Sequence, residues 1–314
     1  MKKIFLFIAT LSTLGTMATE GALSGKFSVA ADKQVVFSQG NLQYQASTNT
    51  YRFATEQIDY IGADNANIAD DYDGFIDLFG WGTGNNPTLS RMNDHDYQTF
   101  TDWGVNAISN GGNMANQWRT LTKDEWVYLF HDRTNAQNLF SLGTIRGIHG
   151  AILLPDNWTT PSGLVFDAST SNGLSWVSDG EYYYDTTKEN HFRDNAYTFS
   201  EWCKMEAAGA VFLPAAGCYR DVNNVGLIGT YWSATPIYEA YAFGLWLDSY
   251  SFGSFLDCRY FGFPVRLVQD YDGPVIGIDN TSVSSKNVKR IINGQLLIER
   301  DGKIYNAQGV LMSE

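Results

Sequence analysis

The sequence predicts an α+β fold that is rich in strands and turns and contains about two helices. Short β-prone runs alternate with Gly, Asn and Asp turns over much of residues 21–112. Only two stretches, 121–133 and 200–208, have the caps and apolar spacing of a helix. Residues 209–268 contain apolar residues that recur with the period of two that is typical of strands.

The first 18 residues have the pattern of a signal peptide. Lys2 and Lys3 precede the apolar run Ile4–Leu14, and Thr16-Met17-Ala18 supplies the small residues of a cleavage site. The run is too short to span a bilayer as a mature helix. Because the first cysteine is Cys203, lipid attachment of the bacterial lipoprotein kind is excluded. A buried N-terminal helix is the alternative, but we expect an exported protein that is secreted, on the outer surface or periplasmic.

Charge disfavours two classes of partner. The 21 basic and 34 acidic residues give a net charge of −13, which becomes −15 once Lys2 and Lys3 are removed. Such a surface repels phosphate backbones and anionic lipids, so we expect no nucleic-acid or direct membrane binding. The cysteines Cys203, Cys218 and Cys258 allow one disulfide at most, so we expect packing to hold the core.

Residues 21–112 are predicted to form antiparallel hairpins, because four β-prone runs are separated by turn residues. The runs are Gly25–Ala30, Gln34–Ser38, Asn41–Gln45 and Thr50–Ala54. No Pro-rich or Ser-rich linker separates this region from the next. We therefore expect it to be the elaborated N-terminal part of one domain, residues 19–268.

Two helices follow from capping patterns. In Leu121–Arg133, Thr122 is placed to cap the helix and Glu125 occupies the capping-box position. The apolar stripe of that helix consists of Trp126, Leu129 and Phe130. Ser200–Ala208 is predicted as a second helix that begins at a serine.

Residues 209–268 are predicted to form a β-meander that closes the core. Between Tyr241 and Asp248 the large apolar residues fall mainly on one parity, so we expect a strand with one buried face. A polar turn at Ser249–Gly253 then lets Phe255–Phe261 run back antiparallel.

These segments also resemble a known family. The anchors Leu213-Pro-Ala-Ala-Gly217, Gly229-Thr-Tyr-Trp-Ser-Ala-Thr235 and Gly262-Phe-Pro-Val-Arg-Leu-Val268 resemble the major paralogous domain of Fibrobacter and Bacteroidetes surface proteins. That domain is similar to the formylglycine-generating-enzyme branch of the C-type-lectin-like fold. Upstream, Trp118-Arg-Thr-Leu-Thr-Lys-Asp-Glu-Trp-Val-Tyr-Leu129 resembles a helix start of the same family. The resemblance covers about half of the chain, 116–268, and implies a C-type-lectin-like fold more strongly than an activity.

The resemblance further implies which residues are structural, because they belong to anchors that recur in this fold whatever its activity. They are Arg119, Glu125, Trp126, Trp232 and Arg266. The pieces Gln39–Tyr44 and Leu78–Thr83 resemble segments that precede the domain in Bacteroidetes secreted proteins.

The chain beyond Val268 changes in composition. Residues 269–287 begin with a polar, turn-prone run and are predicted to be a linker. In 288–314 a strand through Ile298, an Asp-Gly turn and a second strand from Lys303 predict a short β-hairpin. Ile304-Tyr-Asn-Ala-Gln-Gly309 resembles the core of a type IX sorting signal, which would make export machinery a partner; a structural hairpin is the alternative.

The resemblance raises the question of enzyme activity. Formylglycine-generating enzymes oxidise a substrate cysteine with copper held by two closely spaced cysteines in the last loop before the final strand. Here that loop offers only Cys258, and neither Cys203 nor Cys218 has a near sequence partner. A lone thiolate does not supply the paired soft ligands of cuprous ion. We expect no catalysis and no cofactor, with a copper-dependent oxidase as the least favoured alternative.

Other catalytic and metal patterns lack support. Asp70–Gly74, with Asp64 and Asp77, invites a calcium hypothesis, but an EF-type loop needs acidic residues where Ala69 and Gly80 stand. We expect a solvated acidic loop and no metal site. No Gly-x-Ser-x-Gly motif occurs. The histidines share no zinc spacing; they are His95, His131, His149 and His191.

The candidate binding segment is Trp176–Asp185, a turn-rich insertion of aromatic and acidic residues. Such side chains can stack on a sugar and bond its hydroxyls, although packing against the core explains them equally. The residues proposed to contact ligand are Trp176, Asp179, Tyr182, Tyr183 and Tyr184. We expect a non-catalytic module that contacts glycan or protein through lectin-like loops. The alternative is a structural or adhesive envelope component without a specific small ligand.

Overall fold

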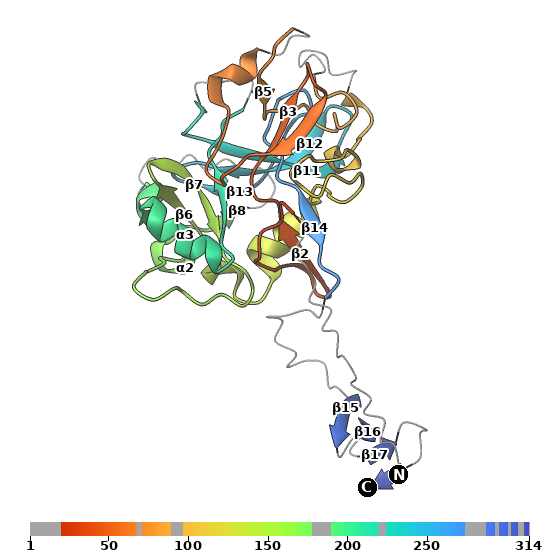
Figure 1. Ribbon diagram of the computed structural model, residues 1–314. Coiled ribbons are helices and arrows are strands. Elements are labelled where there is room, and N and C mark those ends of the chain that lie inside the picture. Colours follow the sequence, from red (N-terminus) through yellow and green to blue (C-terminus); the bar gives the residue numbers. More distant parts are fainter. Residues whose placement is uncertain are drawn as a thin grey trace, which may run out of the picture. The chain divides into compact units, whose positions relative to one another are not determined.

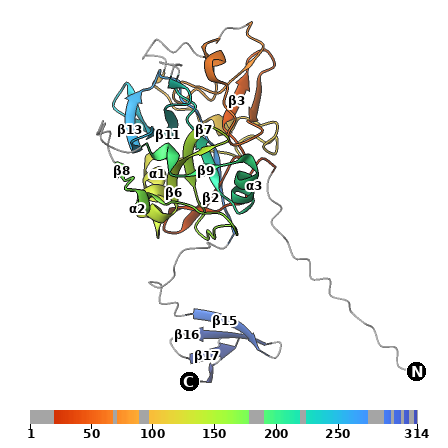
Figure 2. The ribbon, with the colours of Figure 1, turned by 90° about the vertical axis from the view of Figure 1, so that its left-hand side faces the viewer.

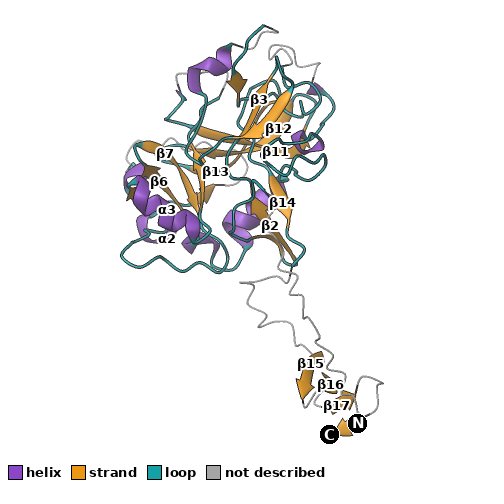
Figure 3. Cartoon of the chain, in the orientation of Figure 1, coloured by secondary structure: helices purple, strands orange, loops and turns teal. Residues whose placement is uncertain are grey.

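The computed structural model describes residues 20–67, 71–88, 97–177, 190–218 and 224–273, together with the backbone of C-terminal strands between residues 287 and 313. The chain divides into two compact units, Met1–Ile276 and Gly277–Glu314. The first unit is a strand-rich α+β structure in which much of the chain lies in loops (Figures 1 and 3).

The described strands of the first unit form four open sheets. Two have three strands: β1-β2-β14 (Phe27–Ala30, Lys33–Phe37, Val268–Asp270) and β4-β3-β5 (Thr50–Phe53, Leu42–Gln45, Phe75–Ile76). Two have four strands: β10-β7-β6-β9 (Val211–Pro214, Ile148–Leu153, Phe140–Ile145, Ala196–Tyr197) and β11-β12-β13-β8 (Gly229–Ile237, Tyr241–Leu247, Phe252–Cys258, Trp176–Val177).

Helices are short and few in the described part of the chain. The α-helices are α1 (Lys123–Val127), α2 (Ser169–Asn172) and α3 (Phe199–Ala207), and a π-helical segment covers Tyr128–Asp132. Short 3-10 helices cover Gly62–Ala66, Trp103–Val105, Ala136–Asn138 and His191–Arg193.

The predicted N-terminal hairpins are confirmed. Strands β1 and β2 pair antiparallel, with Phe27 opposite Val35, and β3 pairs antiparallel with β4. Strand β2 also pairs with β14, where Phe37 lies opposite Val268. The N-terminal strands therefore join one sheet with the segment that ends this unit.

The core consists of buried layers separated by the two larger sheets. On one face of β10-β7-β6-β9, Ile152 and Phe212 pack against Trp202 and Met205 of α3. Leu153 and Leu213 belong to the opposite, central layer, which also holds residues of β1, β2 and α1. Figure 2 shows α1, α2, β6 and β8 close together on one side of the unit.

The meander differs from its prediction, because β12 is covered on both faces rather than one. Leu245 and Leu247 belong to the central layer, whereas Ala242 lies in a further core with Trp232 and Phe255. The N-terminal half of the unit supplies residues of that further core. It therefore covers the face of β12 that the alternating sequence pattern predicted to be exposed to solvent.

Both predicted helices exist with altered bounds. Thr122 and Glu125 form a complete capping box at the start of α1, but the α-helix ends at Val127 and a π-helical turn continues it. Helix α3 begins one residue before the predicted serine, because Thr198 caps it and exchanges hydrogen bonds with Glu201. The serine was the wrong cap, and α2 was not foreseen.

Arg119 holds the start of α1 against β14. Its guanidinium donates to both oxygens of Glu125, at 2.7 and 2.8 Å, and to Asp270 at 2.7 and 2.8 Å. Lys33 also lies 3.2 Å from Glu125. These contacts connect α1, β2 and β14 into one charged network.

The other residues that the resemblance implied to be structural lie in the interior. Trp126 is 2% exposed, and Trp232 is 1% exposed with its indole nitrogen donating to the Phe79 carbonyl at 2.7 Å. Arg266 donates to the side-chain oxygens of Asn41 and Gln57. Burial lowers the pKa of Arg266 to about 10, because neutral oxygens compensate a buried cation only in part.

The C-terminal unit has a four-stranded antiparallel sheet, not a single hairpin. Its order is β15-β16-β17-β18, with strands Asn287–Ile292, Gln295–Arg300, Lys303–Asn306 and Leu311–Ser313. The backbone pairs Ile292 with Gln295 and Arg300 with Lys303. In the sequence, Asn293-Gly294 lies between β15 and β16; this dipeptide is typical of hairpins, and the prediction had left it inside one strand.

Candidate functional site

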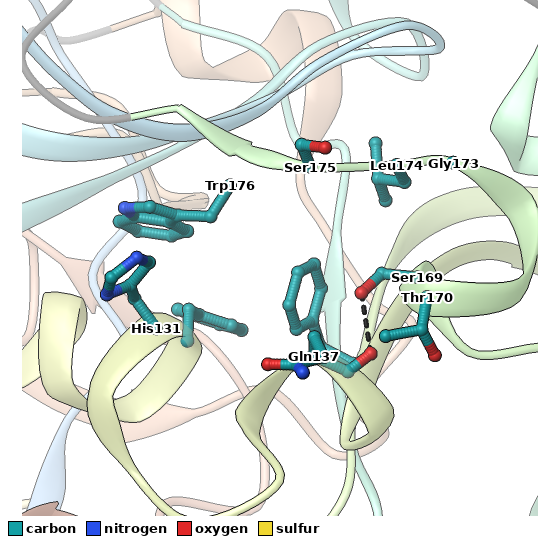
Figure 4. A pocket seen from close by; sticks show the side chains of 10 residues that line it. His131, Gln137, Ser169, Thr170, Gly173, Leu174, Ser175 and Trp176 are labelled. Carbon is teal, nitrogen blue, oxygen red and sulfur yellow. Dashed lines mark hydrogen bonds between the residues drawn. The ribbon is translucent and has the colours of Figure 1, made fainter.

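A pocket of about 400 Å³ lies at the edge of the central layer, a volume typical of small-ligand sites. Its aromatic lining comes from Phe130, Phe140 and Trp176. Its polar lining includes His131, Gln137, Ser169 and Thr170. Figure 4 shows Trp176 and His131 at one end of the pocket, Ser169 and Thr170 at the other, and Gln137 between them.

Trp176 is the outer member of a stack of three aromatic rings. Trp126 and Phe130 stack with centroids 5.9 Å apart at 12°, and Phe130 and Trp176 stack at 5.3 Å and 14°. Phe252 meets the Trp176 ring edge-on at 5.5 Å. The core therefore holds the indole in place through its ring, without a hydrogen bond to its nitrogen.

The indole nitrogen of Trp176 is buried and has no hydrogen-bond acceptor among the described residues. Most buried polar groups in proteins have a partner. Trp176 is the only predicted contact residue that lies in the described part of the chain, and it lines the pocket. Because this nitrogen is itself buried, Trp176 offers a pocket ligand its ring rather than its N–H.

The π-helical turn brings two consecutive residues to the pocket. The Arg133 amide donates to the Tyr128 carbonyl at 2.8 Å, which is the wide hydrogen bond of a π-helix. Phe130 and His131 both line the pocket from this turn. Such turns are frequent at functional sites. The sequence had predicted a regular α-helix over these residues, so the π-helical turn was not foreseen.

Helix α2 forms the opposite wall and is tied to the chain before β6. The Ser169 hydroxyl donates to the Gln137 carbonyl, and the Thr170 hydroxyl donates to the side-chain oxygen of Asn138, each at 2.6 Å. Gly173 ends the helix at φ +80°, a conformation that favours glycine. The chain can therefore turn directly from α2 towards Trp176.

The structure brings Trp176 together with residues that sequence reasoning did not select. Asp179, Tyr182, Tyr183 and Tyr184 fall within 178–189, outside the described residues. The polar run Ser169–Gly173 before Trp176 was a usable signal for the α2 wall. Nothing in the local pattern marked His131 or Gln137, because they lie about 40 residues before Trp176 and reach it only through folding.

The acidic and cysteine side chains of the described residues bear on the metal hypotheses. The described residues contain no group of three or more His, Cys, Asp or Glu side chains that could hold a metal ion. The three cysteines lie in the described residues and form no disulfide: Cys203 is exposed, Cys218 buried and Cys258 half-buried. In the acidic loop, Asp73 accepts hydrogen bonds from Gln45 and Ser47, while Asp70 lies outside the described residues.

No protein-family model, no curated protein and no solved structure matches this chain. In the part of the chain that the structure describes, no helix has the length and apolar character needed to cross a membrane.

Proposed function

We propose that this protein is a non-catalytic, exported or cell-surface module that binds a glycan in the pocket at Trp176. The observation that carries the proposal is the Trp176 indole, which lines the pocket beside His131 and is fixed there by stacking on Phe130. Sugar recognition needs this combination of an aromatic surface and hydrogen-bonding groups. Gln137, Ser169 and Thr170 supply further polar atoms within the same pocket.

Three features support the wider assignment. The N-terminal signal-peptide pattern supports export. The capping box at Thr122 and the contacts of Arg119 lie in a segment that resembles the major paralogous domain, which supports a C-type-lectin-like fold for residues 19–268. The missing cysteine pair in the sequence supports binding without oxidation chemistry.

A glycan array with the chain from Thr19, followed by calorimetry on the glycans that bind, tests the proposal. Trp176→Ala should weaken binding at least about tenfold, because loss of an aromatic anchor commonly costs about 2 kcal/mol or more. Trp158→Ala is the matched control, since Trp158 is half-buried outside the pocket and its nitrogen donates to Thr160. Unchanged affinity of Trp176→Ala would refute the proposed site.

The structural or adhesive role remains the second candidate and predicts a different result. It requires no saturable binding of any glycan on the array, with normal folding of the chain. If the ligand is a protein, no glycan on the array should bind, and binding should appear when candidate proteins are immobilised in place of the glycans. In that case Trp176→Ala locates the contact in the same way.

A further inference from the structure

We infer that the pocket at Trp176 selects neutral, hydroxyl-rich sugars over uronic, sialic or sulfated sugars. This inference rests on the proposed glycan-binding function and adds the chemical class of the sugar. Its basis is the set of hydrogen-bonding atoms that the pocket leaves available after its internal bonds are made.

Two hydroxyls in the pocket have already used their protons. Ser169 donates to the carbonyl of Gln137, and Thr170 donates to the side-chain oxygen of Asn138. A hydroxyl has one proton and two lone pairs. Each of these oxygens can therefore offer only lone pairs to a ligand, which must bring its own donor.

His131 adds a third acceptor. Its Nδ1 lies 2.7 Å from Oδ1 of Asp132, and because a carboxylate only accepts, Nδ1 carries the proton. In the neutral ring the other nitrogen, Nε2, then has a lone pair. The carboxylate of Asp132 also places negative charge beside the pocket wall.

The available side-chain donors are uncharged. They are the hydroxyl of Ser175 and the side-chain amide of Gln137, and the described residues that line the pocket include no Lys or Arg. The several hydroxyls of a sugar can together accept from these groups and donate to the three acceptors, because each hydroxyl brings one proton and two lone pairs. Carboxylate and sulfate groups only accept, so they would leave those acceptors unmatched and their own charge uncompensated.

The test uses matched oligosaccharides on gluco, galacto and manno backbones. Each backbone is supplied as the neutral sugar, as the uronate, and as the fully O-methylated sugar, which is neutral but has no hydroxyl donors. For every backbone that binds, calorimetry should show uronate and O-methylated forms binding at least about tenfold more weakly, as expected when two or more hydrogen bonds are lost. This order should hold at low and at high salt, because the preference does not depend on charge attraction.

Protein variants test the acceptor role directly. Thr170→Val keeps the shape of the side chain but removes its oxygen, and should weaken neutral-sugar binding roughly two- to tenfold. Thr160→Val, at an exposed threonine outside the pocket, should change it less than about twofold. If Thr170→Val does not fold, His131→Phe removes a second acceptor from a side chain that is 63% exposed.

The outcomes separate this inference from the function on which it rests. Equal or tighter binding of a uronate, equal binding of an O-methylated sugar, or unchanged affinity of Thr170→Val would overturn the selectivity while leaving glycan binding intact. Absence of any sugar binding, or binding that Trp176→Ala does not weaken, would overturn both.

Discussion

Arg133 and Asp156 form a buried ion pair of 2.8 Å, with side chains only 1% and 5% exposed. Asp156 also accepts hydrogen bonds from the backbone and hydroxyl of Ser28 and from the side chain of Gln34. It thus links the π-helical turn that precedes Arg133 to β1 and β2. The contacts that support the pocket wall are therefore continuous with the first sheet.

Removal of Asp156 should destabilise the protein strongly. Asp156→Ala leaves the Arg133 guanidinium buried without its carboxylate, and breaking such a pair costs about 3 to 5 kcal/mol. Urea denaturation at neutral pH measures this change in the free energy of unfolding. Asp132→Ala removes a nearby acidic side chain that is 49% exposed and should cost less than about 1 kcal/mol. Similar costs for the two variants would contradict the role of the buried pair.

The two interior tryptophans should be essential to stability. Trp126→Ala and Trp232→Ala each remove a ring that is no more than 2% exposed, so each should cost roughly 3 to 5 kcal/mol. Trp158→Ala removes a half-buried ring and should cost less. Thermal unfolding monitored by circular dichroism compares the three, and unchanged midpoints in the first two would exclude a packing role.

Acid should destabilise the fold through the Arg119 network. Burial acts to raise the pKa of Glu125 and Asp270, but hydrogen bonds and charge from Arg119 outweigh it and hold both pKa values below the ordinary range. A carboxyl with a lowered folded pKa stabilises the fold above its unfolded pKa, about 4, and this contribution is lost as pH falls through the folded pKa.

We therefore expect the free energy of unfolding to decrease from about pH 4 downward, and Glu125→Gln to flatten that decrease while lowering stability at pH 7. Urea denaturation at a series of pH values from pH 7 to below about pH 4 measures the free energy of unfolding. Glu239→Gln removes a charge from an exposed turn and serves as the control. If the free energy of unfolding of Glu125→Gln falls with acid as steeply as that of the original protein, the network does not set the pH dependence.

Truncation after Gly273 should leave the first unit folded. The deletion keeps the contact between Arg119 and Asp270 of β14 and the hydrogen bond from the Tyr271 amide to the Gln34 carbonyl. It removes the C-terminal sheet. We expect a thermal midpoint within about two degrees of the full chain and altered accumulation of the protein in cell fractions. A midpoint several degrees lower with normal export would instead assign the C-terminal unit a stabilising role.

The mature protein should begin near Thr19 and be recovered outside the cytoplasm. Lys2, Lys3 and the apolar run that follows motivate this prediction. N-terminal sequencing of native material decides it, since retention of Met1 would exclude cleavage. Replacing both lysines by glutamate should impair export, because the charged start is part of the signal.

The sequence by itself determined features that depend on near neighbours. The N-terminal hairpins and the capping box of Thr122 and Glu125 were predictable, because turn residues and caps act over two to four positions. Export and the absence of an enzyme activity were also inferred from sequence and remain predictions. The one described residue of the predicted binding segment, Trp176, does line a pocket, but the sequence did not show what it faces.

Only the tertiary structure decided the features that distant residues create. Strand β12 is buried on both faces because the N-terminal half of the unit covers the face opposite Leu245. The pocket arises because the π-helical turn and α2, about 40 residues apart in sequence, meet beside Trp176. The free lone pairs of Ser169 and Thr170 also depend on that meeting, since the partners that take their protons belong to the segment that follows the π-helical turn.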